Sequence, residues 1–271
     1  MYTLQRQCRA CGYGEAVTAP GIKSASNNER LIPVFDLGLQ PLANDFRKDG
    51  EEHSGYAPLQ VLFCPNCSLG QLSVNVDPAI LYNRYCYVTS TSGTMKAHFK
   101  LLAKELKNHF TPTATVLEIG SNDGRLLKCL RDEHGFSNVY GIDPAANLVS
   151  DANKRCIETV QGLFNEKLAV AWKERFGTAD IILARHVFCH IADWKGFIRA
   201  VKHISNRDTL IGIEVPHTKK MLENAEFDTV YHEHLSYLTL KSVVALLRGT
   251  GLHIHNVTEY DIHGGTIVIW I

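Results

Sequence analysis

Two pairs of cysteines have the spacing of metal-binding knuckles. The pairs are Cys8-Arg-Ala-Cys11 and Cys64-Pro-Asn-Cys67, and turn-forming residues lie beside both. Two C-x-x-C pairs in a chain without an export signal are typical of a tetrahedral four-cysteine zinc site. The alternative, four ordinary half-buried cysteines, is disfavoured by the paired spacing. Because four thiolates leave no open coordination position, such a zinc ion would be structural.

Groups that can transfer protons gather in the second half of the chain, where nine of the 13 histidines lie at or beyond His186. The run Tyr231-His-Glu-His234 combines two imidazoles, a carboxylate and a phenol, and His190 follows a predicted strand. Such groups serve as general bases and hydrogen-bond donors. An alternative is a metal site, although the histidines lack the i, i+4 spacing of helical ligands. Its candidate ligands are His232, Glu233, His234 and His263.

A glycine-bearing turn follows an apolar strand near the middle of the chain. The strand covers residues 115–119, the turn runs from Gly120 to Gly124, and a second apolar run ends at Asp143. Strand, glycine turn, helix, strand and acid is the plan of a nucleoside-cofactor site in an open α/β sheet. The glycines let the backbone approach the ligand, and the acid can accept from both ribose hydroxyls.

The spacing of apolar residues predicts the elements that position these groups. Strands are predicted at residues 115–119, 139–142, 157–160, 179–184, 209–215, 253–259 and 265–271. Helices are predicted at residues 95–110, 125–133, 146–155, 165–176, 194–204 and 240–250. Strands separated by helices imply a parallel doubly wound sheet, here with an antiparallel hairpin at one edge.

The domain organisation predicted from the sequence has two parts. A zinc-binding module covers residues 1–78, and a cofactor-binding domain covers residues 79–271, with a helical lead-in at 79–110. Within the module, the polar run at residues 23–30 should be a surface loop.

Composition narrows the class of protein. Lys+Arg and Asp+Glu each number 28, so the net charge of zero argues against a nucleic-acid partner. No apolar stretch reaches the roughly 18 residues of a membrane span, and residues 1–20 lack the apolar core of a signal peptide. We therefore expect a cytoplasmic protein without a membrane partner. In that compartment the eight cysteines are better explained as free or metal-bound thiols than as disulfides.

The glycine turn also bears on the identity of the cofactor. Gly120-x-x-x-Gly124 lacks the G-x-G-x-x-G pattern that holds a dinucleotide pyrophosphate. Residues 121–123 are Ser-Asn-Asp, which adds a negative charge where a pyrophosphate would sit. S-adenosylmethionine carries a positive sulfonium and tolerates that charge better. A NAD-type fold or a sheet without a cofactor is the alternative.

The motif Val-Leu-Glu-Ile-Gly-x-x-x-Gly, followed by Gly-Ile-Asp-Pro, resembles the first two motifs of class I methyltransferases that use S-adenosylmethionine. The resemblance implies a Rossmann-like, mostly parallel seven-stranded sheet. It also implies that Gly120 faces the methionine part, that Asp143 holds the ribose, and that residues 162–164 lie near the adenine. The implied cofactor-binding residues are Glu118, Gly120, Asn122, Gly124, Asp143, Phe164 and His186.

In their order along the chain, the motifs resemble those of sugar C-methyltransferases that carry an N-terminal zinc module. The match covers essentially the whole chain. It comprises Cys8-x-x-Cys11, Leu37-Gly-x-Gln-Pro-Leu-Ala-Asn44, Cys64-x-x-Cys67, Tyr85, the glycine turn, Cys189-His190-Ile191, Tyr231-His-Glu-His234 and His263-Gly-Gly265.

This resemblance implies a reaction and a substrate. A C–H proton next to a ketone is removed, and the resulting enolate takes a methyl group from S-adenosylmethionine. The substrate is then a nucleotide-linked 4-keto-deoxysugar. His234 would be the general base, with Glu233 as its orienting partner or an alternate base. Tyr231 would be a donor in the same pocket, His190 would hydrogen-bond the ketone oxygen, and Tyr85 would be a further active-site tyrosine.

The sequence departs from that family at two points. Family members usually carry a further C-terminal domain that helps to bind the sugar nucleotide, whereas this sequence stops at Ile271. They also tend to have Asn where His186 stands. Two alternatives therefore stay open, a zinc-module RNA methyltransferase and a non-catalytic scaffold that keeps zinc and cofactor. We expect a monomer or weak dimer.

Overall fold

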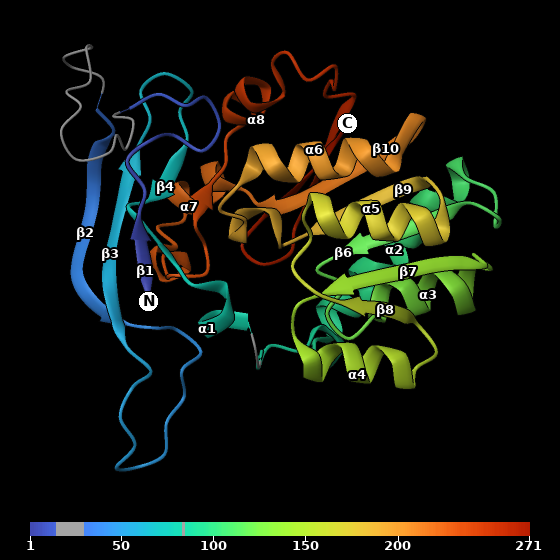
Figure 1. Ribbon diagram of the computed structural model, residues 1–271, viewed down its shortest axis with the longest axis horizontal. Helices are drawn as coiled ribbons and strands as arrows, with labels where there is room; N and C mark the ends of the chain where they lie inside the picture. Colours follow the sequence, from blue (N-terminus) through green and yellow to red (C-terminus); the bar gives the residue numbers. More distant parts are fainter. Residues whose placement is uncertain (15–29, 83–84) are drawn as a thin grey trace. The chain divides into compact units, whose positions relative to one another are not determined.

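The computed structural model (Figure 1) describes residues 1–14, 30–82 and 85–271, which group into two compact units. The first unit takes its described residues from Met1–Leu81, Cys189–Lys195 and Pro216–His253. The second takes them from Tyr82–Phe188, Gly196–Val215 and Ile254–Ile271. Because each unit draws on separated parts of the sequence, a domain boundary at residue 78 stays a prediction. Apart from Arg30, the loop predicted at residues 23–30 lies outside the described residues.

A seven-stranded sheet forms the centre of the second unit, within the part of the chain that is described. Its strands, in spatial order, are β12 (Asn256–Tyr260), β13 (Thr266–Trp270), β10 (Ser205–Pro216), β9 (Ala179–Arg185), β6 (Thr115–Ile119), β7 (Asn138–Asp143) and β8 (Glu158–Gln161). The five strands from β10 to β8 pair in parallel, while β12 and β13 form an antiparallel hairpin. Parallel strands carry their carboxyl ends to one edge of a sheet, where such folds bind ligands.

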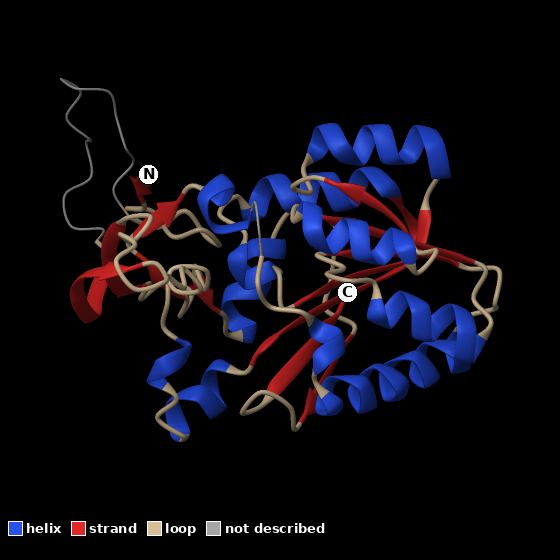
Figure 2. Ribbon diagram, turned by 90° about the horizontal axis from the view of Figure 1, so that it is seen from below, coloured by secondary structure: helices blue, strands red, loops and turns tan. Residues whose placement is uncertain are grey.

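Helices cover both faces of this sheet (Figure 2). They are α2 (Gly93–His109), α3 (Arg125–His134), α4 (Ala146–Lys154), α5 (Glu166–Phe176) and α6 (Trp194–Ile204). Apolar residues of α2 and α3, among them Phe99 and Leu126, pack with Val116, Ile181 and Leu183 in one core cluster. Because strand side chains alternate between faces, residues such as Leu117 and Ile182 are buried on the other face, where α5 and α6 lie.

The first unit is built on antiparallel strands. A four-stranded sheet has the order β11 (Ser236–Tyr237), β4 (Gly70–Leu72), β3 (Tyr56–Phe63) and β2 (Ile32–Pro41), and β1 (Tyr2–Leu4) pairs with β5 (Val74–Val76). The remaining elements of the chain are short: α1 (Pro78–Tyr82), α7 (Thr218–Glu223) and α8 (Leu240–Leu247), with single turns at Thr89–Thr91, Phe188–His190 and Phe227–Thr229. Strand β11 comes from late in the sequence, so the cysteine-bearing module and the segment around residue 234 fold as one unit.

The predicted alternation of strands and helices is close to the observed one. The strand at Thr115–Ile119 and the helix at Trp194–Ile204 have the predicted bounds. The sequence did not predict β11, α7 or the grouping of residues 216–253 with the N-terminal unit. A two-residue strand has no period of its own, and its pairing with Gln71 and Gly70 is fixed by distant residues.

Candidate functional site

The two cysteine knuckles have the same local geometry. In each, the residue after the second cysteine donates its N–H to the carbonyl of the first, from Gly12 to Cys8 at 2.9 Å and from Ser68 to Cys64 at 2.8 Å. Both donors adopt the left-handed region, with φ of 76° at Gly12 and 62° at Ser68. This tight turn brings the two thiols of each pair close to those of the other pair.

The four sulfurs meet at a spacing that suits zinc. Cys8 Sγ and Cys67 Sγ are 3.4 Å apart, and Cys11 Sγ and Cys64 Sγ are 3.6 Å apart. All four lie within 4.8 Å of one another. A Zn–S distance of about 2.3 Å in a tetrahedron separates sulfurs by about 3.8 Å, so small adjustments admit the ion. The donor set therefore fits a structural zinc.

Buried Arg9 connects the first knuckle to the segment that carries the histidines. Its Nη1 donates to the carbonyl of Leu235 at 3.0 Å, and its backbone N–H donates to Gln71 Oε1 at 3.0 Å. Leu72 N–H donates to the same Leu235 carbonyl at 3.0 Å. Burial lowers the pKa of Arg9 to about 9, against the opposing effect of Cys8. The backbone beside His234 is thus held by residues of the zinc module.

The hydrogen bonds of His234 fix its tautomer. Its Nδ1 lies 2.8 Å from the carbonyl oxygen of Thr229, which can only accept, so Nδ1 carries the proton. Its Nε2 lies 2.8 Å from the Tyr231 hydroxyl and accepts from it in the neutral ring. The His190 ring is close by, with centroids 5.2 Å apart. His234 therefore has its basic Nε2 beside a phenol, with a second imidazole close by, and such a nitrogen can accept a proton.

Glu233 contacts the N-terminal module. The Thr229 carbonyl holds His234 Nδ1, and the role of Glu233 as orienting partner or alternate base stays a prediction. Glu233 is buried, and its Oε1 accepts from Asn44 Nδ2 at 2.7 Å. This contact gives Asn44, the last residue of a motif in the N-terminal module, a direct link to the histidine-bearing segment.

The metal site considered for residues 232–234 and 263 is not among the metal-ligating clusters of the described residues. His232 is buried, and its Nε2 donates to the carbonyl of Ala57 at 3.1 Å, which anchors the segment to β3. A different cluster does occur, formed by Cys189, His190 and His234.

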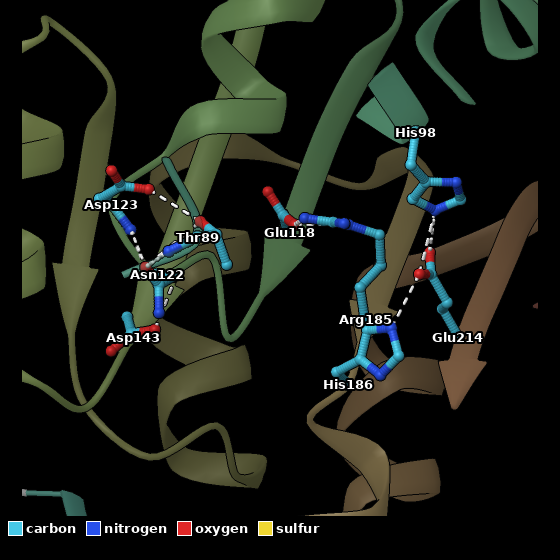
Figure 3. Close-up of polar contacts among 9 residues, drawn as sticks. All are labelled: Thr89, His98, Glu118, Asn122, Asp123, Asp143, Arg185, His186 and Glu214. Carbon is cyan, nitrogen blue, oxygen red and sulfur yellow. Dashed lines mark hydrogen bonds and ion pairs between the residues drawn. The ribbon is translucent and has the colours of Figure 1, made fainter. Parts of the chain in front are cut away.

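In the second unit, the glycine turn and Asp143 form a candidate nucleoside-cofactor site (Figure 3). Gly120 has a φ of 69°, and a Cβ there would lie 2.8 Å from Val187. The two carboxylate oxygens of Asp143 accept from Asn122 N–H at 2.8 Å and from Ala145 N–H at 2.9 Å. Burial raises the pKa of Asp143, while these two N–H groups oppose the shift. Each oxygen keeps a further lone pair for a ribose hydroxyl, so the cradle fits the cofactor.

The side chain of Asn122 contacts protein groups on both sides. Its Oδ1 accepts from Thr89 N–H at 3.1 Å, and its Nδ2 donates to the Tyr87 carbonyl at 3.0 Å. The Thr89 hydroxyl donates to Asp123 Oδ1 at 2.9 Å. Asn122 and Asp123 thus hold the segment around Thr89 against the turn, and a cofactor contact of Asn122 stays a prediction.

The negative charge of Asp123 in the glycine turn is paired with a cation. Asp123 is fully buried, and its Oδ2 lies 3.0 Å from Arg155 Nη1. Arg155 further donates to the Asp123 carbonyl at 2.8 Å. Because a cation pairs with this carboxylate, the turn does not present an uncompensated negative charge. The electrostatic reason given for excluding a dinucleotide was therefore wrong, although the cofactor inferred from it is supported below.

Beneath the turn, Glu118 forms an ion pair with Arg185 (Figure 3). Arg185 donates to Glu118 Oε1 from Nε at 2.8 Å and from Nη2 at 2.6 Å, and its guanidinium lies 4.5 Å from the centre of the Phe99 ring. Burial raises the pKa of Glu118 to about 7, and Arg185 opposes this shift. Among the described residues, Glu118 Oε2 is buried without a hydrogen-bond partner, so one acceptor stays available.

His186 joins a second buried group in the same unit. Its Nε2 and that of His98 each lie 3.0 Å from Oε1 of Glu214 (Figure 3). Burial alone would raise the pKa of Glu214, but the hydrogen bonds from His186 and His98 outweigh it and lower that pKa. The His263 ring packs edge-on against His186 at 5.3 Å. His186 is thus tied to β10 and α2, and its contact with cofactor stays a prediction.

The remaining predicted site residues lie in the second unit. Gly124 has a φ of 71° and precedes α3. Tyr85 accepts from Asn147 Nδ2 through its carbonyl at 3.0 Å, and its ring packs edge-on against Tyr82. Phe164 is half-buried and packs edge-on against Phe197 at 5.5 Å.

Sequence reasoning missed several residues that position these groups. They are Arg9, Asn44, Thr89, Arg155, Arg185, Glu214 and Thr229. Most act through non-local contacts that leave no spacing signal. Asn44 is the exception, because it ends a motif that the family resemblance had already marked.

Comparisons with known proteins identify the class of protein. A family model described as a methyltransferase domain matches residues 93–257, which is more than half of the chain, and a second model, for a zinc binding domain, matches residues 25–82. The chain therefore belongs to the methyltransferase domain family, with a class I fold. The predictions of that fold, and of S-adenosylmethionine and structural zinc as cofactors, are confirmed.

Among individual proteins, the chain is similar to C-methyltransferase NovU of Streptomyces niveus, with 32% identity over 268 residues. The alignment covers 97% of this chain and 60% of NovU, so the chain spans about three fifths of the length of that relative. This similarity confirms the predicted family resemblance.

Solved structures support the fold alone. The SAM-dependent methyltransferase from Anabaena variabilis has a TM-score of 0.52 and 15% identity, covering 68% of this chain and 87% of its own. The PH0226 protein from Pyrococcus horikoshii has a TM-score of 0.51 and 10% identity, covering 72% and 95%. Within the described residues, every helix is too short or too polar to cross a bilayer.

Proposed function

We propose that this chain is an S-adenosylmethionine-dependent C-methyltransferase that acts on a nucleotide-linked 4-keto-deoxysugar. The observation that carries the proposal is the tautomer of His234. Its protonated Nδ1 is held by the Thr229 carbonyl, and its basic Nε2 lies beside the Tyr231 hydroxyl. Similarity to NovU supports methyl transfer to carbon.

Methylation of carbon needs an enolate, because a neutral carbon next to a ketone is a poor nucleophile. His234 Nε2 removes the C–H proton, either directly or through the Tyr231 hydroxyl, which passes its own proton to the imidazole. General base catalysis contributes only about 10²–10⁴, so hydrogen-bond donors to the enolate oxygen are also required. His190, whose ring lies 5.2 Å from that of His234, is the donor we assign to the oxygen.

The residues to which we assign cofactor binding lie in the second unit. When bound, S-adenosylmethionine supplies an electrophilic methyl group on its sulfonium. Asp143 holds the ribose hydroxyls, and Gly120 faces the methionine part, at a turn whose packing against Val187 leaves no space for a Cβ. Thr89 hydrogen-bonds to Asn122 and Asp123, which holds the segment around Thr89 against the glycine turn.

A proton-exchange assay tests the base separately from the transfer. Nucleotide-linked 4-keto-deoxysugars are incubated with the protein in deuterium oxide without S-adenosylmethionine, and deuterium uptake at the carbons next to the ketone is followed by mass spectrometry. We expect uptake in the wild type, and a gain of one methyl group once the cofactor is added. His234→Ala should lower both rates by at least about 10² while cofactor binding is retained.

The matched control is His253→Ala, because His253 is an exposed histidine of the same unit. Wild-type exchange in the His234→Ala protein would remove His234 from its role. Binding of S-adenosylmethionine without exchange or methylation of any 4-keto sugar would favour the scaffold. Salt-sensitive RNA binding would favour the RNA methyltransferase.

A further inference from the structure

Apart from the four cysteines, one metal-ligating cluster occurs among the described residues. Cys189, His190 and His234 each offer one ligand atom, and these three atoms lie within 4.8 Å of one another. All three residues belong to the first unit. One thiol and two imidazoles are ligands that Zn²⁺ favours, and three protein ligands leave its fourth position open.

His234 already has the hydrogen bond that accompanies metal ligation. A metal-bound histidine commonly donates its other ring N–H to a backbone carbonyl or a carboxylate, which fixes the tautomer and ring orientation. Nδ1 of His234 does so toward Thr229 O at 2.8 Å. Nε2 is then the nitrogen with the lone pair, and an ion would compete with the Tyr231 hydroxyl for it.

A small pocket lies beside the cluster, and one buried polar group is among its lining residues. The pocket is lined by Cys189, His234 and Ser236, together with Thr218 and Met221. Among the described residues, the Ser236 hydroxyl is buried without a hydrogen-bond partner. It can therefore bind a water molecule that completes the coordination of an ion, as buried polar atoms in structural water sites do.

We propose that Cys189, His190 and His234 form a second zinc site, separate from the four-cysteine site. A zinc ion bound at this second site prevents His234 from acting as a base. Binding breaks the S–H bond of Cys189, forms a sulfur–zinc bond and releases one proton to solvent. Zinc at Nε2 takes the lone pair that His234 needs for proton removal. Binding itself is independent of the proposed function, whereas inhibition rests on it.

The test uses the full chain with its four-cysteine site loaded with zinc. Co²⁺ is titrated in as a spectroscopic probe, and a chromophoric chelator reports any zinc displaced from the first site. We expect one further equivalent of Co²⁺ to bind without zinc release, with a thiolate-to-cobalt absorption band. Cys189→Ser should remove the band and weaken binding at least about tenfold, the scale of losing a metal-binding contact.

Cys129→Ser is the matched control, because Cys129 is also a buried cysteine but lies in the second unit. It should retain the band and the affinity. The proposal is overturned if the wild type binds no second equivalent, or if Cys189→Ser retains the band without zinc release.

Inhibition is measured on the deuterium exchange described above. Added Zn²⁺ should suppress exchange in the wild type and in Cys129→Ser, and about tenfold more Zn²⁺ should be needed in Cys189→Ser. If no sugar substrate undergoes exchange, the proposed function fails while the cobalt titration still decides the site. If cobalt binds but Zn²⁺ leaves exchange unaffected, the metal site is established and the inhibition of His234 is overturned.

Discussion

Asp143 offers the sharpest perturbation of the candidate cofactor site, because its carboxylate has a structural role and a proposed binding role. One oxygen accepts from Asn122 N–H at 2.8 Å and the other from Ala145 N–H at 2.9 Å. In Asp143→Asn one of these N–H groups faces an amide NH₂ and loses its acceptor. A buried unsatisfied N–H costs about 1–3 kcal/mol, so the variant should unfold more easily by that amount.

The same substitution should also weaken cofactor binding, as a separate effect from the change in stability. Hydrogen bonds to a charged acceptor contribute about 1.5–3 kcal/mol each, so losing the carboxylate at the ribose should weaken S-adenosylmethionine at least about tenfold. Calorimetric titration with S-adenosylmethionine, at a temperature where the variant is folded, measures the affinity. Asp180→Asn is the control, because Asp180 accepts a backbone N–H from Thr115 in the same sheet at 2.7 Å. It should lose stability without losing affinity.

The pH dependence gives an independent check. Burial raises the pKa of Asp143, so its carboxylate is lost on acidification at a higher pH than an ordinary aspartate loses it. Affinity for S-adenosylmethionine should therefore fall as the pH falls through that raised pKa, and Asp143→Asn should flatten this fall. Wild-type affinity in a folded Asp143→Asn protein, at all pH values, would refute the ribose assignment.

Three further perturbations test other parts of the structure. Removing zinc should unfold the N-terminal module, since structural zinc contributes on the order of 10–16 kcal/mol to folding; an unchanged melting curve after verified removal would contradict a structural role. Gly120→Ala should destabilise the protein by about 1–3 kcal/mol more than Gly135→Ala, because both glycines have positive φ but a Cβ meets Val187 only at Gly120. Glu214→Gln should lower the free energy of unfolding at pH 7, and the deficit should shrink below about pH 4.3. The pKa of Glu214 is lowered in the folded state, so the stabilisation by its carboxylate is complete above the unfolded pKa and is lost on acidification. Denaturant titrations of both proteins at several pH values measure the deficit of the variant. A deficit that stays constant with pH would contradict this account.

The sequence predicted the second unit well because its signals are local. Strands such as β6 and β13 carry their own apolar runs, and the crossover helices show their own period. The pairing of the knuckles was equally readable, because cysteine spacing reports directly on ligand geometry. The grouping of residues 216–253 with the N-terminus was not readable, since it depends on a two-residue strand and on single contacts such as that of Arg9 with Leu235.

The same distinction separates the parts of the candidate site. Asp143 and Gly120 were found from strand ends and turn chemistry, which a sequence displays. The role proposed for His234 came from a family resemblance, and its contact with the Thr229 carbonyl was not predicted because a backbone carbonyl has no signature in the sequence. Likewise, Asp123 was counted as a free charge because its pairing with Arg155 spans 32 residues.

The zinc module then has a consequence for the chemistry as well as for folding. Arg9 lies between the two cysteines of the first knuckle and donates to the carbonyl of Leu235, the residue next to His234. Leu72, close after the second knuckle, donates to the same carbonyl. If loss of zinc loosens both donors, the segment that carries His234 and Tyr231 loses two of its attachments, while those through His232, Glu233 and β11 remain. Hydrogen exchange at residues 231–237 should accordingly rise with zinc removal, and protection that persisted there would show that this segment is held independently of the zinc site.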